Sequence, residues 1–167
     1  MTKSTIKKCV AILFVIYVIA LIYVLFMDNR QRFGMFLIEI TPFSKAHFEM
    51  FLNLIPFKTE IDYFKQLAEH SINTRTVIMN IGVNLILFLP MGMALPVLFE
   101  NKFNKLWKVL FLVVAVVIIC ETIQFVTVRG SADIDDVILN TVGAAIGYGI
   151  VHLRSMKELL KSNNKGV

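Results

Sequence analysis

Four long apolar stretches alternate with polar segments along the 167 residues of the chain. The first two, at residues 9–27 and 76–99, contain no charged side chain, and the others lie at 107–128 and 136–153. A helix needs about 20 residues to cross a hydrocarbon core of about 30 Å, so each stretch predicts a transmembrane helix. The last stretch is short, but thinning of the bilayer and snorkelling of its polar flanks accommodate it.

The segments between these helices complete the expected architecture. Residues 28–75 form a long mixed-charge segment without a spanning run, and residues 154–167 form a polar tail that we expect to fray. The pattern predicts an all-α integral membrane protein of the cell membrane, with a four-transmembrane-helix bundle. We expect the chain, residues 1–167, to be a single multi-pass membrane domain.

The N-terminus resembles a signal peptide, because Lys3, Lys7 and Lys8 precede the first apolar stretch. That stretch exceeds a typical signal-peptide core, and no Ala-x-Ala cleavage site precedes Asp28. We therefore expect an uncleaved first transmembrane helix.

Composition supports a membrane protein and excludes some other classes. Hydrophobic residues make up 57% of the chain, against about 45–50% in soluble domains, and the mean hydropathy is +0.72. Cys9 and Cys120 both lie inside apolar stretches, so we expect small buried side chains and no disulfide. The net charge of +5 is explained by anchoring residues at the membrane, and we expect no nucleic-acid partner.

The distribution of lysine and arginine predicts the orientation. Ten of the 17 lie in the N-terminus, the loop 101–108 and the tail. Because positive residues favour the cytoplasm, both termini should be cytoplasmic, and segment 28–75 and loop 129–136 should face outward. In segment 28–75, Ile61, Phe64 and Ala68 follow helical spacing, which predicts an amphipathic helix at the interface. A helix that covers the bundle is favoured over a substrate lid.

Three features of the helices concern packing and geometry. Pro90 should kink the second transmembrane helix, because it lacks a backbone donor. Asn80 and Asn84 share one face of that helix, where hydrogen bonding between helices is favoured over ligand contact. Gly143 and Gly147 form a GxxxG step, which is explained by close helix packing.

Polar residues from three separate segments should meet in the outer third of the membrane. Glu121 should lie about 10 Å below the outer end of its helix, at 1.5 Å per residue. An ionisable group at this depth is expensive and marks a functional site. The candidate ligand-binding residues are Asn84, Glu121, Gln124, Arg129, Asp133, Asp135, Asp136 and Asn140.

Simpler explanations exist for part of this set. Ser131 or Asp133 could cap the fourth transmembrane helix, and Arg129 could pair with an aspartate. They leave Glu121 without a partner. The surplus of carboxylates over Arg129 indicates a bound cation, an amine-bearing ligand or raised pKa values. Oxygen ligands would suit Mg²⁺ or Ca²⁺, so a divalent cation is one alternative, although no cofactor is expected.

The order of several short motifs resembles the VanZ family of membrane proteins, which is named for teicoplanin resistance. The resemblance covers most of residues 37–150. It is carried by Asn53-Leu-Ile-Pro-Phe57, Asn84-Leu-Ile-Leu-Phe-Leu-Pro-Met-Gly92, Glu121-Thr-Ile-Gln124, Arg129-Gly-Ser-Ala-Asp-Ile-Asp-Asp136, Asn140-Thr-Val-Gly143 and Gly147.

This resemblance implies a Gram-positive-type envelope protein that lowers susceptibility to lipid-anchored glycopeptides such as teicoplanin. Membrane lipids, the lipoglycopeptide itself or a lipid-linked cell-wall precursor are then the expected partners. A binding protein and a membrane enzyme that modifies a lipid-linked surface component both fit, the enzyme using Glu121 and the aspartates as acid, base or metal ligands. No HExxH motif or Cys/His cluster is present, and His47, His70 and His152 are expected at surfaces. An ion-coupled transporter is the least favoured, because the charges give no path across the membrane.

Overall fold

The computed structural model of the chain describes residues 3–27 and 42–163. It is mostly helical, and four helical stretches are long and apolar enough to cross a membrane. They are α1 (Lys3–Met27), α5 (Thr74–Leu87) continued by α6 (Leu89–Leu98), α7 (Leu106–Val126) and α8 (Ile134–Asn163). The predicted four-helix membrane architecture is therefore confirmed.

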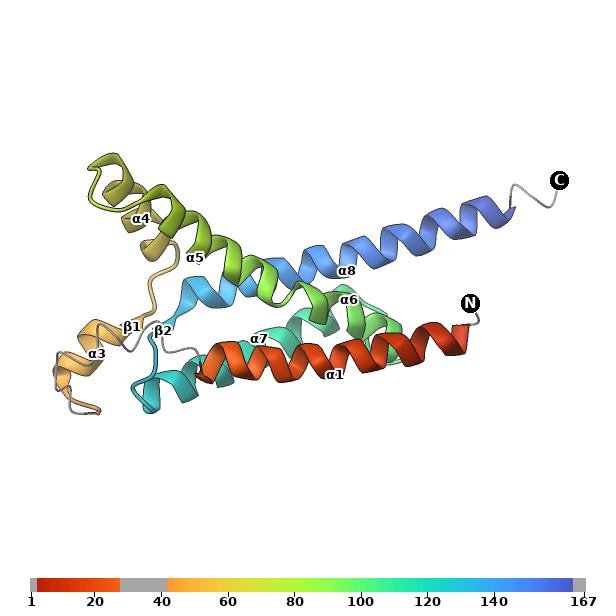
Figure 1. The fold of residues 1–167 in the computed structure, drawn as a ribbon, viewed down its shortest axis with the longest axis horizontal. Coiled ribbons are helices and arrows are strands. Elements are labelled where there is room, and N and C mark those ends of the chain that lie inside the picture. Colours follow the sequence, from red (N-terminus) through yellow and green to blue (C-terminus); the bar gives the residue numbers. More distant parts are fainter. Residues whose placement is uncertain (1–2, 28–41, 164–167) are drawn as a thin grey trace.

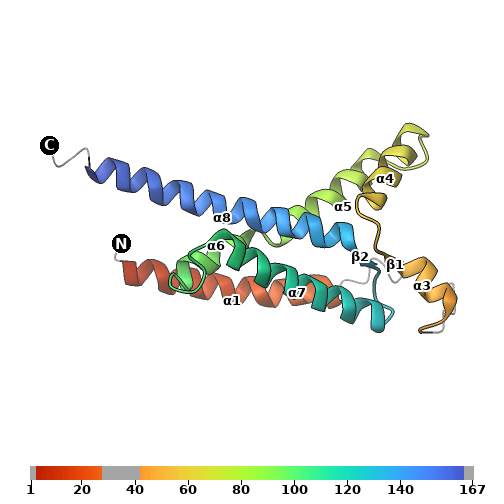
Figure 2. The same ribbon diagram turned by 180° about the vertical axis from the view of Figure 1, so that it is seen from behind.

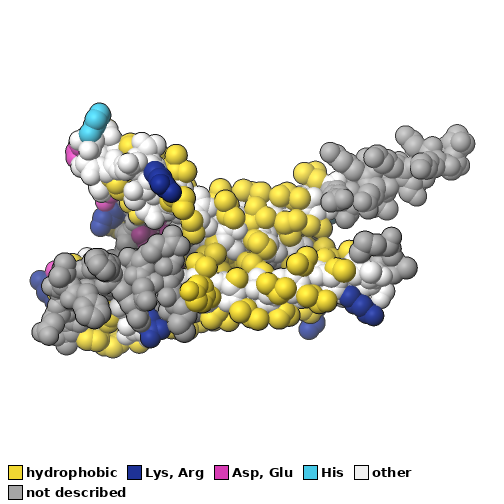
Figure 3. All heavy atoms as spheres, in the orientation of Figure 1, with side chains coloured by type: hydrophobic (Ala, Val, Ile, Leu, Met, Phe, Trp, Pro, Cys, Tyr) yellow, Lys and Arg dark blue, Asp and Glu magenta, His cyan; other side chains and the backbone are white. Residues whose placement is uncertain are grey.

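The helices α1, α7 and α8 run roughly lengthwise, and α1 begins and α8 ends at the same end of the molecule (Figures 1 and 2). We call the opposite end, which carries α3, α4 and the two short strands, the outer end. A broad apolar surface covers the middle of the bundle, and charged side chains gather mainly toward its ends (Figure 3). Which end faces the cytoplasm stays a prediction from the charge distribution.

The second membrane crossing is interrupted, as predicted from Pro90. The helix α5 ends at Leu87, Phe88 lies between the two helices, and α6 begins with Pro90 in its first turn. The hydroxyl of Tyr17, on α1, donates a hydrogen bond to the Leu87 carbonyl at 2.9 Å. A neighbouring helix thus satisfies a backbone group at the break, as a helix interruption inside a membrane requires.

Three glycines bring α8 against α5 and α6 at backbone contact. A Cβ atom on Gly143 would lie 1.9 Å from the Leu85 carbonyl oxygen, and one on Gly147 would lie 2.2 Å from that of Leu89. On the facing helix, a Cβ on Gly92 would lie 2.0 Å from the Ala144 oxygen. Close packing, as predicted for the GxxxG step, is confirmed.

The core is formed by one stripe of α7 with parts of α1, α6 and α8. Val109, Val113 and Val117 recur every four residues on α7 and are almost fully buried, and Phe88 packs with them. Spacing of four keeps these side chains on one face of the helix. The remaining faces of the helices expose apolar side chains, as expected where lipid is the solvent.

The outer end contains short elements between α1 and α5. They are α3 (Lys45–Phe51), β1 (Leu52–Asn53) and α4 (Lys58–Ala68). The helix α4 lies where an amphipathic helix was predicted, and it packs beside α5 to form an arm that diverges from the bundle (Figures 1 and 2). The strand β1 pairs in parallel with β2 (Ala132–Asp133), a contact that sequence reasoning did not anticipate.

Two further expectations from the sequence are corrected. His47 was expected at a surface but is 0% exposed, and its ring stacks on Phe125 of α7 at 4.2 Å between centroids. The aromatic contact anchors α3 to the end of α7. The tail was expected to fray after residue 153, whereas α8 continues to Asn163. The part of segment 28–75 before residue 42 lies outside the described residues.

Candidate ligand-binding site

A cavity of about 380 Å³ lies where α1, α5, α7 and α8 meet the first turns of α4, at the outer end. Acidic side chains are visible in the recess between the α4–α5 arm and the body of the molecule (Figure 3). Seven of the eight candidate residues line this cavity: Asn84, Glu121, Gln124, Arg129, Asp133, Asp136 and Asn140. The structure thus brings together residues from α5, α7, β2 and α8 that lie up to 56 positions apart in the sequence.

Glu121 lies on the last turns of α7 and is 9% exposed. Its Oε2 accepts a hydrogen bond from the backbone N–H of Asp133 at 3.4 Å. The chain turns back after α7, so that this N–H lies over the carboxyl group. Among the described residues this is the one hydrogen bond of the Glu121 side chain, so most of its capacity is available to a group in the cavity, because a carboxylate has about four acceptor positions.

Asp136 is the meeting point of two asparagine side chains. Asn84 Nδ2 donates to Asp136 Oδ1, which links α5 to α8. Asn140 Nδ2 donates to the backbone carbonyl of Asp136 at 2.7 Å. The residue Asn140 is 4% exposed, and its Oδ1 has no hydrogen-bond partner in the described part of the chain. Asn84 therefore makes the predicted contact between helices and also lines the cavity.

Gln124 lies in the last turn of α7, and Arg129 lies in the turn that follows this helix. Gln124 Nε2 donates to the Leu25 carbonyl at 2.8 Å and so satisfies one of the free carbonyls at the end of α1. Val128 has a left-handed φ of 52°, unusual for a branched side chain, in the turn that presents Arg129. Arg129 is exposed, and among the residues with described side chains it forms no ion pair.

Asp133 caps the fourth transmembrane helix, as one of the simpler explanations predicted. Its Oδ1 accepts from the Asp135 N–H at 2.9 Å and from Asn53 Nδ2 at 3.0 Å, and its Oδ2 accepts from Thr59 Oγ1 at 2.5 Å. These bonds join the start of α8 to β1 and to the start of α4. Asp133 therefore organises the outer end in addition to lining the cavity.

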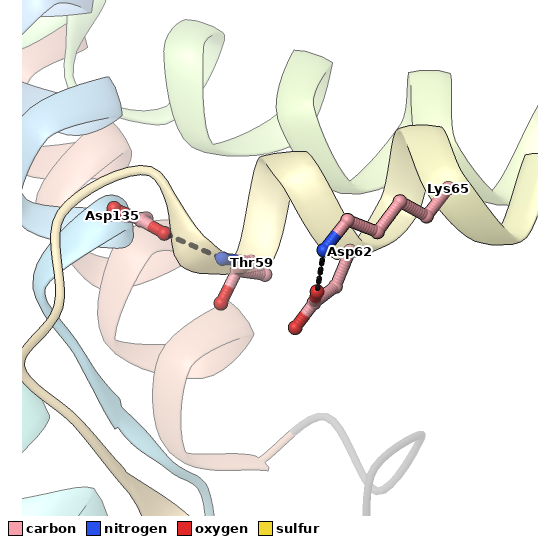
Figure 4. Close-up of polar contacts among 4 residues, drawn as sticks. All are labelled: Thr59, Asp62, Lys65 and Asp135. Carbon is pink, nitrogen blue, oxygen red and sulfur yellow. Dashed lines mark hydrogen bonds and ion pairs between the residues drawn. The ribbon is translucent and has the colours of Figure 1, made fainter.

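Asp135 is the one candidate that does not line the cavity. It is 1% exposed, and its carboxylate accepts hydrogen bonds from the backbone N–H groups of Phe57 at 2.5 Å and Thr59 at 2.9 Å. Figure 4 shows Asp135 reaching from the start of α8 to the first turn of α4. Phe57 has a left-handed φ of 63°, which is unfavourable for a residue with a bulky side chain, and the hydrogen bond to the Asp135 carboxylate stabilises this turn. The geometry gives Asp135 the role of an anchor for α4.

The helix α4 supplies cavity residues that sequence reasoning assigned to a covering helix. Thr59, Glu60 and Tyr63 all line the cavity, and the Tyr63 hydroxyl accepts from Asn80 Nδ2 at 3.1 Å. Every side chain of α4 stays at least partly exposed, so polar contacts hold the helix in place. The helix α4 therefore both covers the bundle and lines the cavity. The nearest sequence signal was the Asn53-to-Phe57 motif directly before α4, in which Asn53 is bonded to the cavity residue Asp133.

Glu60 makes the attachment of α4 dependent on pH. Burial raises the pKa of Glu60 to about 7, and the Asp135 and Asp133 carboxyl groups add to the shift. Burial, with Asp136 and Asp133, also raises the pKa of the neighbouring Tyr63. A raised carboxyl pKa means that the folded state is stabilised by the proton, so stability is lost as the pH rises from about 4.5 to about 7.

We therefore expect amide protection factors in α4 to fall as the pH rises from about 4.5 to about 7, in hydrogen-exchange measurements corrected for intrinsic rates. Glu60→Gln should remove this dependence, because its amide does not titrate. Glu69→Gln, an exposed change near the end of the same helix, should keep it. A pH dependence that survives Glu60→Gln would contradict the assignment.

The cavity does not contain a ready-made metal site among the described residues. No group of three or more His, Cys, Asp or Glu side chains there is arranged to hold a metal ion. The carboxyl groups of Asp133 and Asp135 are instead engaged with backbone and side-chain donors. The divalent-cation alternative therefore gains no support from the geometry.

Comparison with known proteins gives one result. The family model described as VanZ/LLP1 matches residues 14–155, which include all eight candidate residues and the start of α4. Neither the curated proteins nor the solved structures that were searched gave a significant match. With most of its length matched, from the middle of α1 into α8, the chain belongs to the VanZ/LLP1 family.

Proposed function

We propose that this chain is a cell-envelope membrane protein that reduces susceptibility to lipid-anchored glycopeptides such as teicoplanin. It does so by binding a lipid-linked ligand, either the drug or a cell-wall precursor, in the outward-facing cavity at the outer end. The observation that carries the proposal is the convergence on one cavity of seven polar residues, from α5, α7, β2, α8 and the turn after α7. Membership of the VanZ/LLP1 family supports the connection with glycopeptides.

The lining of the cavity favours a ligand that is polar at one end and apolar at the other. Val24 of α1 and Val83 of α5 both line the cavity and are 38% and 41% exposed, on faces that would meet lipid. The walls formed by α4, α7 and α8 are polar. A molecule anchored in the outer leaflet could place its head group against these walls without leaving the membrane.

Two residues are assigned complementary roles in binding. Glu121 accepts hydrogen bonds from the ligand, because most of its acceptor positions are unused by the described residues. Arg129 binds an anionic group such as a phosphate or carboxylate of the ligand, since it is exposed at the cavity and a guanidinium matches such groups bidentately.

The experiment is a susceptibility comparison in a sensitive Gram-positive host that expresses the chain. We expect the wild type to raise the inhibitory concentration of teicoplanin but not of vancomycin. Glu121→Gln and Arg129→Ala should abolish protection, because each removes a charged hydrogen-bonding group from the cavity, and the loss of about 1–3 kcal/mol weakens binding roughly tenfold or more. Membrane levels of all variants are matched by immunoblotting.

Two changes outside the cavity serve as controls. Glu69→Gln, directly after α4, and Arg75→Ala, on α5, remove the same charges from exposed positions and should retain protection. Equal loss in controls and cavity variants would contradict the assignment of the site. No protection by a well-expressed wild type would contradict the proposed function.

A further inference from the structure

The cavity carries a strong excess of acidic over basic groups. Among its lining residues, Glu60, Glu121, Asp133 and Asp136 are acidic, and Arg129 is the single basic residue. Like charges so close together are costly unless a cation lies among them or some of the carboxyl groups bind a proton. The cavity is therefore electrostatically suited to a positively charged group.

Two buried oxygen atoms of the lining have no partner in the described part of the chain. One is Oδ1 of Asn140, a residue that is 4% exposed, and the other is Oε2 of Glu60. They belong to α8 and α4, on two different walls. A buried acceptor without a donor is unfavourable, so a bound ligand that donates to both oxygen atoms would remove this cost.

A primary ammonium group fits these requirements better than a metal ion. It carries the positive charge and has three donors and no acceptor. The described carboxyl groups are not clustered for metal coordination, and the volume of about 380 Å³ is that of a site for an organic head group.

The surroundings of the cavity indicate that the amine belongs to a lipid. An apolar groove of about 280 Å³ runs between α1 and α6, lined by Val10, Phe14 and Tyr17 on the α1 side. Val24, which lines the polar cavity, continues the same stripe of α1 at helical spacing. From Tyr17 to Val24 the rise is roughly 10 Å. Head-group cavity and apolar groove thus lie in line along one helix.

We propose that the polar cavity binds the protonated primary amine of a membrane lipid head group, with an acyl chain in the α1–α6 groove. This inference rests on the proposed function in that it names the chemistry of the lipid-linked ligand. The ammonium donates to Asn140 and Glu60, and the carboxyl groups of Glu121 and Asp136 line the same cavity.

The test measures lipid binding to the full chain purified in detergent, by native mass spectrometry. The probes are phosphatidylethanolamine, its N-acetylated derivative with the same chains, and soluble glycerophosphoethanolamine. We expect phosphatidylethanolamine to bind at least about tenfold more tightly than either of the others. Glu60→Gln should reduce the preference for the free amine severalfold, and Glu69→Gln, at the residue that follows α4, should not.

Each outcome discriminates between parts of the inference. If phosphatidylethanolamine and its N-acetylated derivative bind equally well, the cavity does not recognise the protonated amine. If the soluble head group binds as tightly as the lipid, the acyl chain does not contribute to binding. If Glu60→Gln is folded, as judged by its circular dichroism, and still prefers the free amine as the wild type does, the amine does not bind in this cavity. Because the proposed function is tested by drug protection, a protein that protects but ignores the amine refutes this inference alone.

Discussion

Gly143→Ala should destabilise the protein by about 3 kcal/mol or more, because there is no space for a side chain at this position. An ideal Cβ would lie 1.9 Å from the Leu85 carbonyl oxygen, which is backbone and cannot rotate away. The helices α5 and α8 would have to separate. Asn84 directly precedes Leu85, so its hydrogen bond to Asp136 would be lost with the packing. The measurement is denaturant or thermal unfolding of the purified protein in detergent.

Gly149→Ala is the matched control for this change. It lies on the same helix, and nothing approaches its Cβ position within 4 Å. We expect its stability to equal or slightly exceed that of the wild type, since alanine favours a helix over glycine by up to about 1 kcal/mol. If the two alanine variants unfold alike, the close contact between α5 and α8 does not exist as described.

Asp135→Asn should release α4 from the cavity while the membrane helices stay assembled. The carboxylate accepts two backbone N–H groups, from Phe57 and Thr59, and is 1% exposed. An asparagine can accept only one of them and would direct its own NH₂ at the other. Because hydrogen bonds to a charged group contribute about 1.5–3 kcal/mol each, we expect local destabilisation of about 2–4 kcal/mol. Hydrogen exchange should show it as lost amide protection across residues 57–68.

Asp62→Asn tests whether the loss of amide protection in α4 is specific to Asp135. Asp62 lies on α4 itself and pairs with Lys65 at 3.8 Å, an exposed ion pair (Figure 4). Such pairs contribute roughly 0–1 kcal/mol, so protection of α4 should hardly change. Protection lost equally in both variants would show that α4 is not held by Asp135, and lost protection in α8 would show that the change acts on the whole fold.

The fold could be predicted from the sequence because its strongest signals are local. Each membrane helix is a long apolar stretch, the break at Pro90 lies within its own helix, and the four-residue spacing of Gly143 and Gly147 is a short motif that is typical of close helix packing. The convergence of Asn84, Glu121 and Asp136 also followed, since topology and depth alone place them at one end. These inferences need only helix geometry and the thickness of a membrane.

The outer end could not be predicted, because its contacts join residues far apart in sequence. Asn53 bonds to Asp133, and Phe57 to Asp135, across intervals of 80 and 78 residues. No periodicity encodes the position of such a loop. The contributions of Glu60 and Tyr63 to the cavity and the burial of His47 were missed for the same reason. A buried His and an exposed His have the same local sequence signal.

The most direct test of the central claim is a saturation titration of the purified protein with fluorescently labelled teicoplanin. The account predicts saturable binding to the wild type, at least about tenfold weaker binding to Glu121→Gln, and unchanged binding to Glu69→Gln. The Glu121 carboxyl group lines the cavity, whereas Glu69 does not. Absence of saturable binding to folded wild type, or equal affinities in all three proteins, would contradict the claim that the outer cavity is the ligand site.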